Sequence, residues 1–278
     1  MEPSTADTCS RALRDGPPWW RFQWMRKWCD WRWILVAAFL MPVIGQAQDV
    51  ERGTQYLGRE IAMTMHWTGA NWLIRTKRER EEAASTMRKE LRLKPGMVAC
   101  DMGCGNGYHT IPMAESVGEK GAVYAVDIQQ EMLDLLAKRC EAKGISTVVP
   151  ILGGDTDPKL PEDEIDLILM VDVYHEFSHP AEMLAGMRKA LRKGGVVVLV
   201  EYREEDPTVP IKPLHKMSKA QINKEMKANG FKLVREFQEL PWQHMMFFGR
   251  DDDASFEETA KAEGTEDGRK ETQGTQEE

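Results

Sequence analysis

The 278-residue chain has few cysteines, no internal repeat and no apolar run long enough to cross a bilayer comfortably. Its five cysteines are odd in number and lack paired spacing, which argues against a disulfide framework. The apolar run at residues 34–44 holds 11 residues, whereas a membrane helix needs about 20. A basic stripe with interleaved aromatic residues is also missing from the predicted domain, so we expect no nucleic-acid partner.

The apolar run at 34–44 nevertheless has the surroundings of an export signal. Basic, tryptophan-rich residues precede it at 21–32, and the small residues Gly45 and Ala47 follow it at the −3 and −1 positions of a cleavage site. We therefore expect residues 1–47 to be a signal peptide or an uncleaved membrane anchor. The protein is then exported (periplasmic or secreted) or membrane-associated through its N-terminus, with a cytoplasmic location as the alternative.

Charge is concentrated at the other end of the chain. The formal net charge is −8, and residues 251–278 carry 11 acidic and three basic side chains, so the remainder is about neutral. This tail has one aromatic residue and many Glu, Thr and Gly. Such a composition predicts a disordered, solvated segment.

Strand-like and helix-like patterns alternate through residues 95–250, which predicts an α/β domain with a doubly wound, mostly parallel sheet covered on both faces. Residues 48–94 precede it and are expected to form a helical cap, with helices near 56–65 and 71–91. In the domain we expect strands at 97–101, 122–127, 148–152, 165–171 and 196–202, helices at 129–143, 180–191 and 218–229, and a closing antiparallel pair at 231–240 and 242–249.

The most informative segment follows the first expected strand. It places Asp101 at the strand end and then glycine at every second position, as Gly103, Gly105 and Gly107. Glycine lacks a Cβ and tolerates positive φ, so a ligand can lie directly against this turn. A helix is expected from Tyr108, and its free N–H groups would suit an anionic or carboxylate-bearing ligand.

Three further acidic residues follow expected strands. Asp127 ends the second strand, Asp155 follows the third, and Asp172 follows the fourth, 165–171. The carboxyl ends of parallel strands share one edge of the sheet, where ligands of open α/β sheets bind. We therefore expect these side chains and the glycine turn to surround one site.

This pattern over residues 95–250 resembles class I S-adenosylmethionine-dependent methyltransferases, whose sheet has seven strands. Small-molecule members, including the quinone-biosynthesis C-methyltransferases, have the most similar pattern. The resemblance implies S-adenosylmethionine as cofactor and a small-molecule or lipid-like acceptor. It implies that the glycine loop holds the methionine end, that Asp127 holds the ribose, and that Asp155 lies near the adenine amino group. The segment from Asp172 to Phe177 would end against the sulfonium and the acceptor.

Candidate residues for the reaction are fewer. An acceptor that must lose a proton needs a base, and His175 is the first candidate because it follows the fourth strand. The substrate candidates are Tyr56, Arg59, His66 and His215, and Arg59 could bind the cofactor carboxylate through a bidentate fork.

The sequence also contains the pattern H-E-x-x-H, which in zinc proteases places two histidines on one helical face. Here it runs from His175 to His179, between a strand and Pro180, and the residue before a proline avoids helical geometry. We therefore expect a strand–loop–helix arrangement and no metal site.

Two other functions stay open. A nicotinamide-dependent oxidoreductase would also use a glycine-rich turn, but its spacing is G-x-G-x-x-G with the acidic residue about 20 residues later. A non-catalytic module with the same fold would bind the cofactor, or nothing, without turnover.

Overall fold

The computed structural model describes residues 52–256. The expected signal or anchor segment at 1–47 therefore lies outside the described residues, as does the tail from 257 onward. Of the expected tail at 251–278, residues 251–256 are described, and they make contacts with the preceding domain. Asp253 accepts a hydrogen bond from the backbone N–H of Gly194 at 2.6 Å, and Asp251 and Asp252 pair with Arg188.

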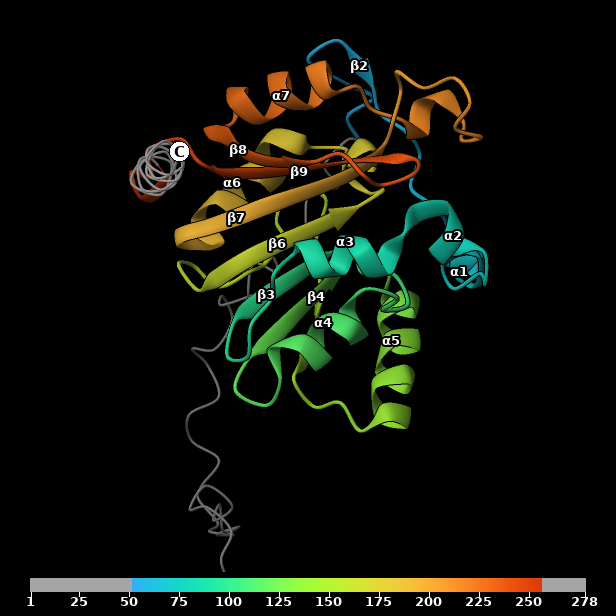
Figure 1. The fold of residues 1–278 in the computed structure, drawn as a ribbon, viewed down its shortest axis with the longest axis vertical. Helices are drawn as coiled ribbons and strands as arrows, with labels where there is room; N and C mark the ends of the chain where they lie inside the picture. Colours follow the sequence, from blue (N-terminus) through green and yellow to red (C-terminus); the bar gives the residue numbers. More distant parts are fainter. Residues whose placement is uncertain (1–51, 257–278) are drawn as a thin grey trace, which may run out of the picture. The chain divides into compact units, whose positions relative to one another are not determined.

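Seven strands form one sheet in the order β5-β4-β3-β6-β7-β9-β8, which confirms the predicted fold (Figure 1). Four neighbouring pairs of strands are parallel, and β9 runs antiparallel to both β7 and β8. The strands are β3 (Val98–Met102), β4 (Ala122–Asp127), β5 (Val148–Leu152), β6 (Ile165–Val171), β7 (Leu191–Tyr202), β8 (Phe231–Phe237) and β9 (Gln243–Arg250).

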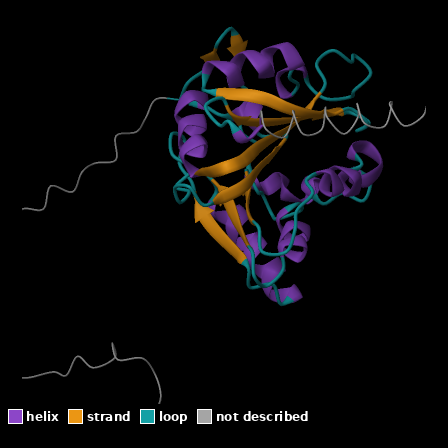
Figure 2. Ribbon diagram, turned by 60° about the vertical axis from the view of Figure 1, so that its left-hand side comes forward, coloured by secondary structure: helices purple, strands orange, loops and turns teal. Residues whose placement is uncertain are grey.

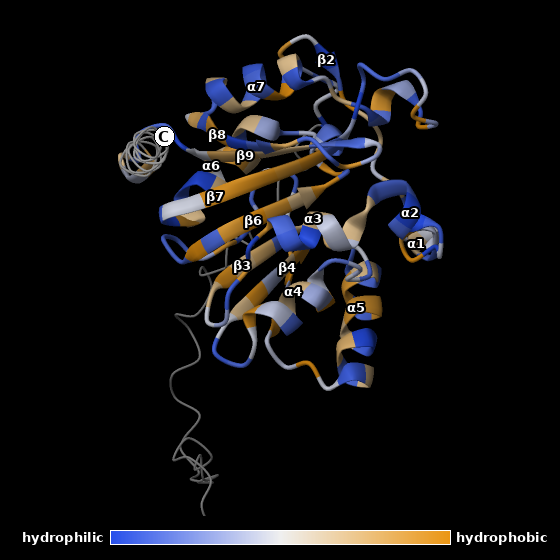
Figure 3. Cartoon of the chain, viewed as in Figure 1, coloured by the Kyte–Doolittle hydropathy of each residue, from blue (hydrophilic) through white to orange (hydrophobic). Residues whose placement is uncertain are grey.

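Helices cover both faces of this sheet (Figure 2). On one face, apolar side chains of β3, β6, β7 and β9 pack against α6 and α7, and on the other against α3 and α4, with α5 beside β4. Burial on both faces explains why the central strands are almost wholly apolar (Figure 3). The helices are α3 (Ala84–Glu90), α4 (Thr110–Val117), α5 (Gln130–Lys143), α6 (Pro180–Ala190) and α7 (Lys219–Ala228).

Most expected boundaries agree closely with the structure, and two differences have local causes. Strand β7 begins at Leu191 rather than near 196, because Leu191 pairs with Ile165 before a bulge. Helix α4 begins at Thr110 rather than Tyr108, so Tyr108 and the N-cap residue His109 lie between Gly107 and the first helical residue.

The segment before the sheet is less helical than expected. Instead of a helix near 56–65, β1 (Gln55–Tyr56) and β2 (Arg59–Glu60) form a small hairpin that turns at Leu57 and Gly58, both with positive φ. The chain then continues without regular secondary structure to His66, and the backbone N–H of Ala62 bonds to the carbonyl of His175 at 3.1 Å. Backbone groups committed to other elements in this way are not available for a helix.

The expected helix at 71–91 is broken into three pieces, of which α3 is the last. The other two are α1 (Ala70–Leu73) and α2 (Arg78–Glu82), and a short 3₁₀ turn, η2 (Trp67–Gly69), precedes them. Ala83 has φ 48°, a left-handed conformation that ends α2 and redirects the chain into α3. Within 52–256, no helix has both the length and the apolar character needed to cross a membrane.

Candidate functional site

A cavity of about 470 Å³ opens at the carboxyl ends of β3, β4 and β6. Residues 64–78 contribute one side of its lining, and the loop at 210–215 contributes to another. Gln129 fastens the first of these segments, because its side chain accepts the N–H of Trp67 at 2.8 Å and donates to the carbonyl of Met65 at 2.9 Å. The cavity is therefore built from three separate parts of the chain.

The predicted glycine turn lies at the cavity. Gly103, Gly105 and Gly107 all have positive φ, at 70°, 51° and 82°, and the first two line the cavity directly. A Cβ on Gly103 would meet Val173 at 2.3 Å, so the turn and the segment after β6 approach too closely for a side chain.

The turn contributes shape more than hydrogen-bond donors. The N–H groups of Gly103 and Cys104 both bond to the carbonyl of Val126, and that of Gly107 bonds to the carbonyl of Cys104. These three N–H groups are therefore already bonded within the protein.

Asp127 is held rigidly at the end of β4. Its Oδ1 accepts the N–H of Gln129 and its Oδ2 accepts the N–H of Gly105, both at 2.9 Å. The side chain lines the cavity and is 8% exposed, and burial raises the pKa of its carboxyl group. Each oxygen keeps a lone pair beyond its backbone bond, so this carboxylate can also accept bonds from a ligand.

Asp101 plays a different part. It is buried, does not line the cavity, and accepts a hydrogen bond from the hydroxyl of Thr110 at 2.5 Å. Burial raises its pKa to about 6, although the bond from Thr110 acts in the opposite direction. Its position indicates that it ties the start of α4 to β3 beneath the turn.

Asp172 has the most unusual environment of the predicted acidic residues. It follows β6 with φ 52° and lines the cavity. Oδ2 accepts a bond from the side-chain amide of Gln243 at 2.8 Å, whereas Oδ1 is buried and has no hydrogen-bond partner. Burial, together with the charges of Glu82 and Glu201, raises its pKa well above the usual value.

Asp155 also lines the cavity and is exposed.

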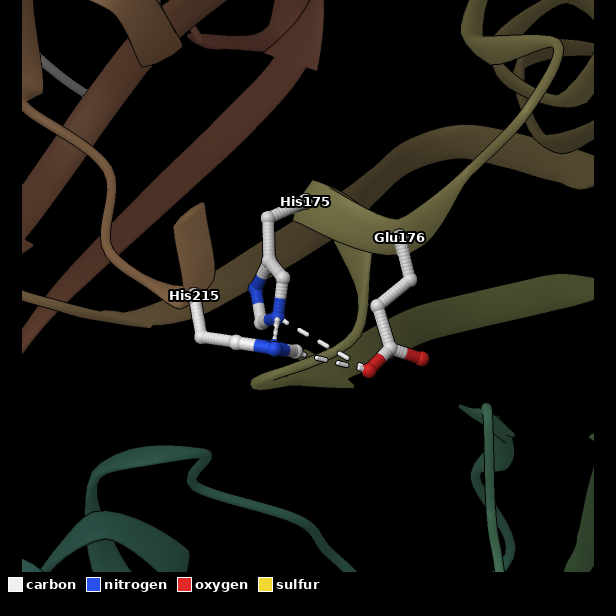
Figure 4. Close-up of side chains that lie close together, drawn as sticks. All are labelled: His175, Glu176 and His215. Carbon is white, nitrogen blue, oxygen red and sulfur yellow. Dashed lines mark hydrogen bonds and ion pairs between the residues drawn. The ribbon is translucent and has the colours of Figure 1, made fainter. Parts of the chain in front are cut away.

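His175 belongs to a polar cluster at the cavity (Figure 4). It lies in η3 (Tyr174–Glu176), and its Nδ1 is 2.6 Å from Oε2 of Glu201 on β7. Its Nε2 is 3.0 Å from Nδ1 of His215, which belongs to η4 (Pro213–His215). Burial lowers the pKa of His175, but the neighbouring carboxyl groups, chiefly that of Glu201, together outweigh burial, and the net shift of the pKa is upward. The structure thus brings two of the predicted residues, His175 and His215, together.

The other three substrate candidates do not line the cavity. Arg59 forms a two-point ion pair with Glu225, at 2.8 and 3.0 Å, and donates to the carbonyl of His175 at 2.9 Å. The Tyr56 hydroxyl accepts a bond from Asn229, and His66 caps η2 by accepting the N–H of Thr68.

The H-E-x-x-H pattern has the expected geometry. His175 and Glu176 lie in η3, whereas His179 is the N-cap of α6 and its Nδ1 is 3.0 Å from Oγ of Ser178. In the described part of the chain, the side chains close enough to share a cation are His175, Glu176 and His215, and His179 is not among them.

Sequence reasoning missed three residues of the site. Glu201 is an acidic residue at the end of the apolar strand β7, and that contrast is a signal that could have identified it. Arg78 is a buried arginine that lines the cavity and pairs with Glu82 at 2.6 Å. Gln129 carries no sequence signal, because its partners lie more than 60 positions away.

A model of a family described as a methyltransferase domain matches residues 93–261. Among solved structures, an S-adenosylmethionine-dependent methyltransferase from Aquifex aeolicus superposes with a TM-score of 0.63 at 22% identity, over 66% of this chain and 98% of that one. This likeness concerns the fold.

Curated relatives match over shorter stretches. The demethylmenaquinone methyltransferase of Geobacillus stearothermophilus is 26% identical over 139 residues, which is 50% of this chain and 59% of that protein. The nocamycin O-methyltransferase of Saccharothrix syringae is 36% identical over 75 residues, 27% of each chain. The chain therefore matches 59% or less of the length of these relatives.

Proposed function

The chain belongs to the methyltransferase domain family, and from this premise we propose that it is an S-adenosylmethionine-dependent methyltransferase acting on a small-molecule acceptor. The observation that carries the proposal is the single cavity bordered by Gly103, Gly105, Asp127 and Asp172. When bound, the cofactor supplies a methyl group on a positively charged sulfur. The protein has to bind both partners, align them and exclude water.

Asp127 supports a ribose-bearing cofactor. Its two oxygens are already oriented by two backbone N–H groups, so little freedom is lost when they accept bonds from two neighbouring hydroxyls. Gly103 presents bare backbone to the same cavity, and the side chain of Val173 packs against it. The cavity volume of about 470 Å³ also lies within the range of small-molecule sites.

Asp172 supports a ligand with a positive charge. A buried carboxylate oxygen without a partner is unfavourable, and a cation in the cavity would relieve that cost. The sulfonium and the ammonium of the cofactor are cations of this kind. The other end of the amino acid carries a carboxylate, and we assign its partner to Arg78 rather than Arg59, because Arg78 lines the cavity and Arg59 does not.

The acceptor site lies beside His175 and His215. The neighbouring lining residues Val173, Phe177 and Ile211 are apolar, which favours a largely apolar acceptor, lipid-like or aromatic, with one polar reacting group. His175 remains the proposed base for an acceptor that must lose a proton. Its Nδ1 is fixed by Glu201, so its Nε2 is the nitrogen on the side of His215.

The proposal is tested with the full-length protein, methyl-labelled S-adenosylmethionine and a panel of phenols, quinones, lipids and small acids. We expect micromolar cofactor binding by calorimetry and transfer of label to one acceptor class. Binding without transfer to any acceptor would favour a non-catalytic module. Binding of NADH in place of the methyl donor would favour an oxidoreductase, and the absence of all binding would refute the proposal.

Export through the N-terminus is proposed separately. The run at 34–44 with its basic flank supports it. Cell fractionation of the full chain, with N-terminal sequencing of the product, tests it. Recovery of an unprocessed chain from the cytoplasm would refute export.

A further inference from the structure

We propose that His175, Glu176 and His215 form a binding site for a divalent transition-metal cation. The three side chains converge from two short turns, η3 and η4, and point toward one another (Figure 4). One ligand atom from each lies within 4.8 Å of the other two. Two imidazoles and one carboxylate are the ligand types that zinc, iron and cobalt accept. The proposal departs from the sequence-based expectation of no metal site.

The distances fit a metal centre. His175 Nε2 lies 3.0 Å from His215 Nδ1 and 3.9 Å from Glu176 Oε1, and the third side, from His215 Nδ1 to Glu176 Oε1, is 3.8 Å. A point equidistant from the three atoms is about 2.1 Å from each, which matches typical zinc–nitrogen and zinc–oxygen bonds. A cation could therefore be bound with only small side-chain movements.

Glu201 prepares His175 for this role. It accepts the backbone N–H groups of Tyr174 and His175 through Oε1, at 2.9 and 3.3 Å, while its Oε2 faces Nδ1 of His175 at 2.6 Å. The carboxylate accepts, so Nδ1 carries the proton and Nε2 presents its lone pair to the cluster. A carboxylate behind a histidine is the usual outer partner of a metal-binding imidazole.

The site is open on the side where the proposed acceptor binds. All three ligand residues line the cavity, and three protein ligands leave coordination positions free, as in catalytic rather than structural metal sites. We infer that the cation binds an oxygen of the acceptor, such as a hydroxyl or carboxylate oxygen. A metal-bound hydroxyl loses its proton more readily, so in the loaded protein Nε2 of His175 is a ligand and no longer a base.

Without a cation, the same atoms make ordinary contacts. Nε2 of His175 and Nδ1 of His215 share a hydrogen bond at 3.0 Å, and Oε1 of Glu176 lies 3.9 Å from the first nitrogen and 3.8 Å from the second. A purely structural cluster of this kind would bind no metal with defined stoichiometry. That difference is measurable without any knowledge of the acceptor.

The test uses the full-length protein, stripped with a chelator and titrated with Co²⁺ by visible absorption and with Zn²⁺ by calorimetry. We expect one equivalent bound per chain, with a Co²⁺ spectrum typical of nitrogen and oxygen ligands. His215→Ala and Glu176→Gln each remove one ligand and should weaken binding by about 100-fold, at least the cost of losing an outer partner. Glu176→Gln keeps the size of the side chain and one of its oxygens, so its fold should be intact.

His66→Ala is the matched control, because His66 is an imidazole outside the cluster and the cavity lining. It should bind the metal as the unmodified chain does. Absence of a bound equivalent, equal binding by the ligand variants, or a thiolate charge-transfer band would overturn the inference. Cofactor binding, measured on the same stripped samples, reports on the proposed methyltransferase function independently.

Discussion

Asp127→Asn is the sharpest test of the cofactor site, because the carboxylate is oriented in the protein before any ligand binds. Both of its oxygens accept backbone N–H groups, from Gln129 and Gly105, at 2.9 Å each. Asparagine has nearly the same shape but only one oxygen. The NH₂ group of the asparagine must therefore face one of the two N–H donors. This NH₂ group cannot accept a hydrogen bond from a ligand hydroxyl, as the carboxylate oxygen in its place does.

The expected loss follows from the bonds that disappear. A hydrogen bond to a charged acceptor contributes about 1.5–3 kcal/mol. Asp127→Asn removes one such bond to the ribose and makes the other neutral, which together amount to about 3 kcal/mol. That is roughly a 100-fold increase in the dissociation constant of S-adenosylmethionine.

Calorimetric titration of the full-length chain with S-adenosylmethionine and S-adenosylhomocysteine measures this loss. Asp134→Asn is the control, because Asp134 is an exposed carboxylate on α5 outside the cavity lining. Thermal melting establishes that both variants are folded at the titration temperature. If Asp127→Asn binds within about threefold of the unmodified chain, our assignment of the ribose to this residue is wrong.

Three further predictions concern stability. Burial raises the pKa of Asp101 to about 6 in the folded protein, whereas an unfolded chain releases this proton near pH 4. The folded state therefore holds more protons between these two pH values. The free energy of unfolding should fall as the pH rises from about 4 to 6. Asp101→Asn should remove roughly 2 kcal/mol of this pH dependence, measured by urea unfolding at pH 4.5 and 7; an unchanged slope would contradict it. Gly105→Ala forces a side chain into φ 51° and should lower the free energy of unfolding by about 1–2 kcal/mol, visible as a lower melting temperature. Arg59→Ala leaves the fully buried carboxylate of Glu225 without its cationic partner and should cost about 3–5 kcal/mol by urea unfolding, and a loss below 1 kcal/mol would mean that the pair is not a structural anchor.

The strands were predictable because their pattern is local. The run Ile165–Val171 is buried along almost its whole length, and its apolar sequence indicated a central parallel strand with the observed bounds. The glycine turn and Asp127 were also identifiable, since strand ends and glycine spacing are properties of neighbouring residues. They were predicted to border one cavity, and Gly103, Gly105 and Asp127 do.

Contacts between distant residues were not predictable in the same way. The role of Arg59 depends on Glu225, 166 positions later, and no local pattern reveals that the two meet. Residues near 56–65 have helix-compatible side chains, but the left-handed turn at Leu57–Gly58 and the bond from Ala62 to His175 keep the segment from forming a helix. The pairing of His175 with His215 likewise depends on how two loops meet at the cavity.

The hydrogen bonds to the main-chain oxygen of His175 come from a distant part of the sequence, and this constrains how the chain can evolve. This oxygen receives hydrogen bonds from Ala62 and from Arg59, and Arg59 is held in turn by Glu225 on α7. A histidine of the site is therefore supported by two segments that are remote from it in the gene. Recombination that exchanged the N-terminal segment between relatives would separate Arg59 from Glu225. We expect that pair to be inherited together, and chimeras that split it to lose the local geometry of His175 even when every residue of the cavity is retained.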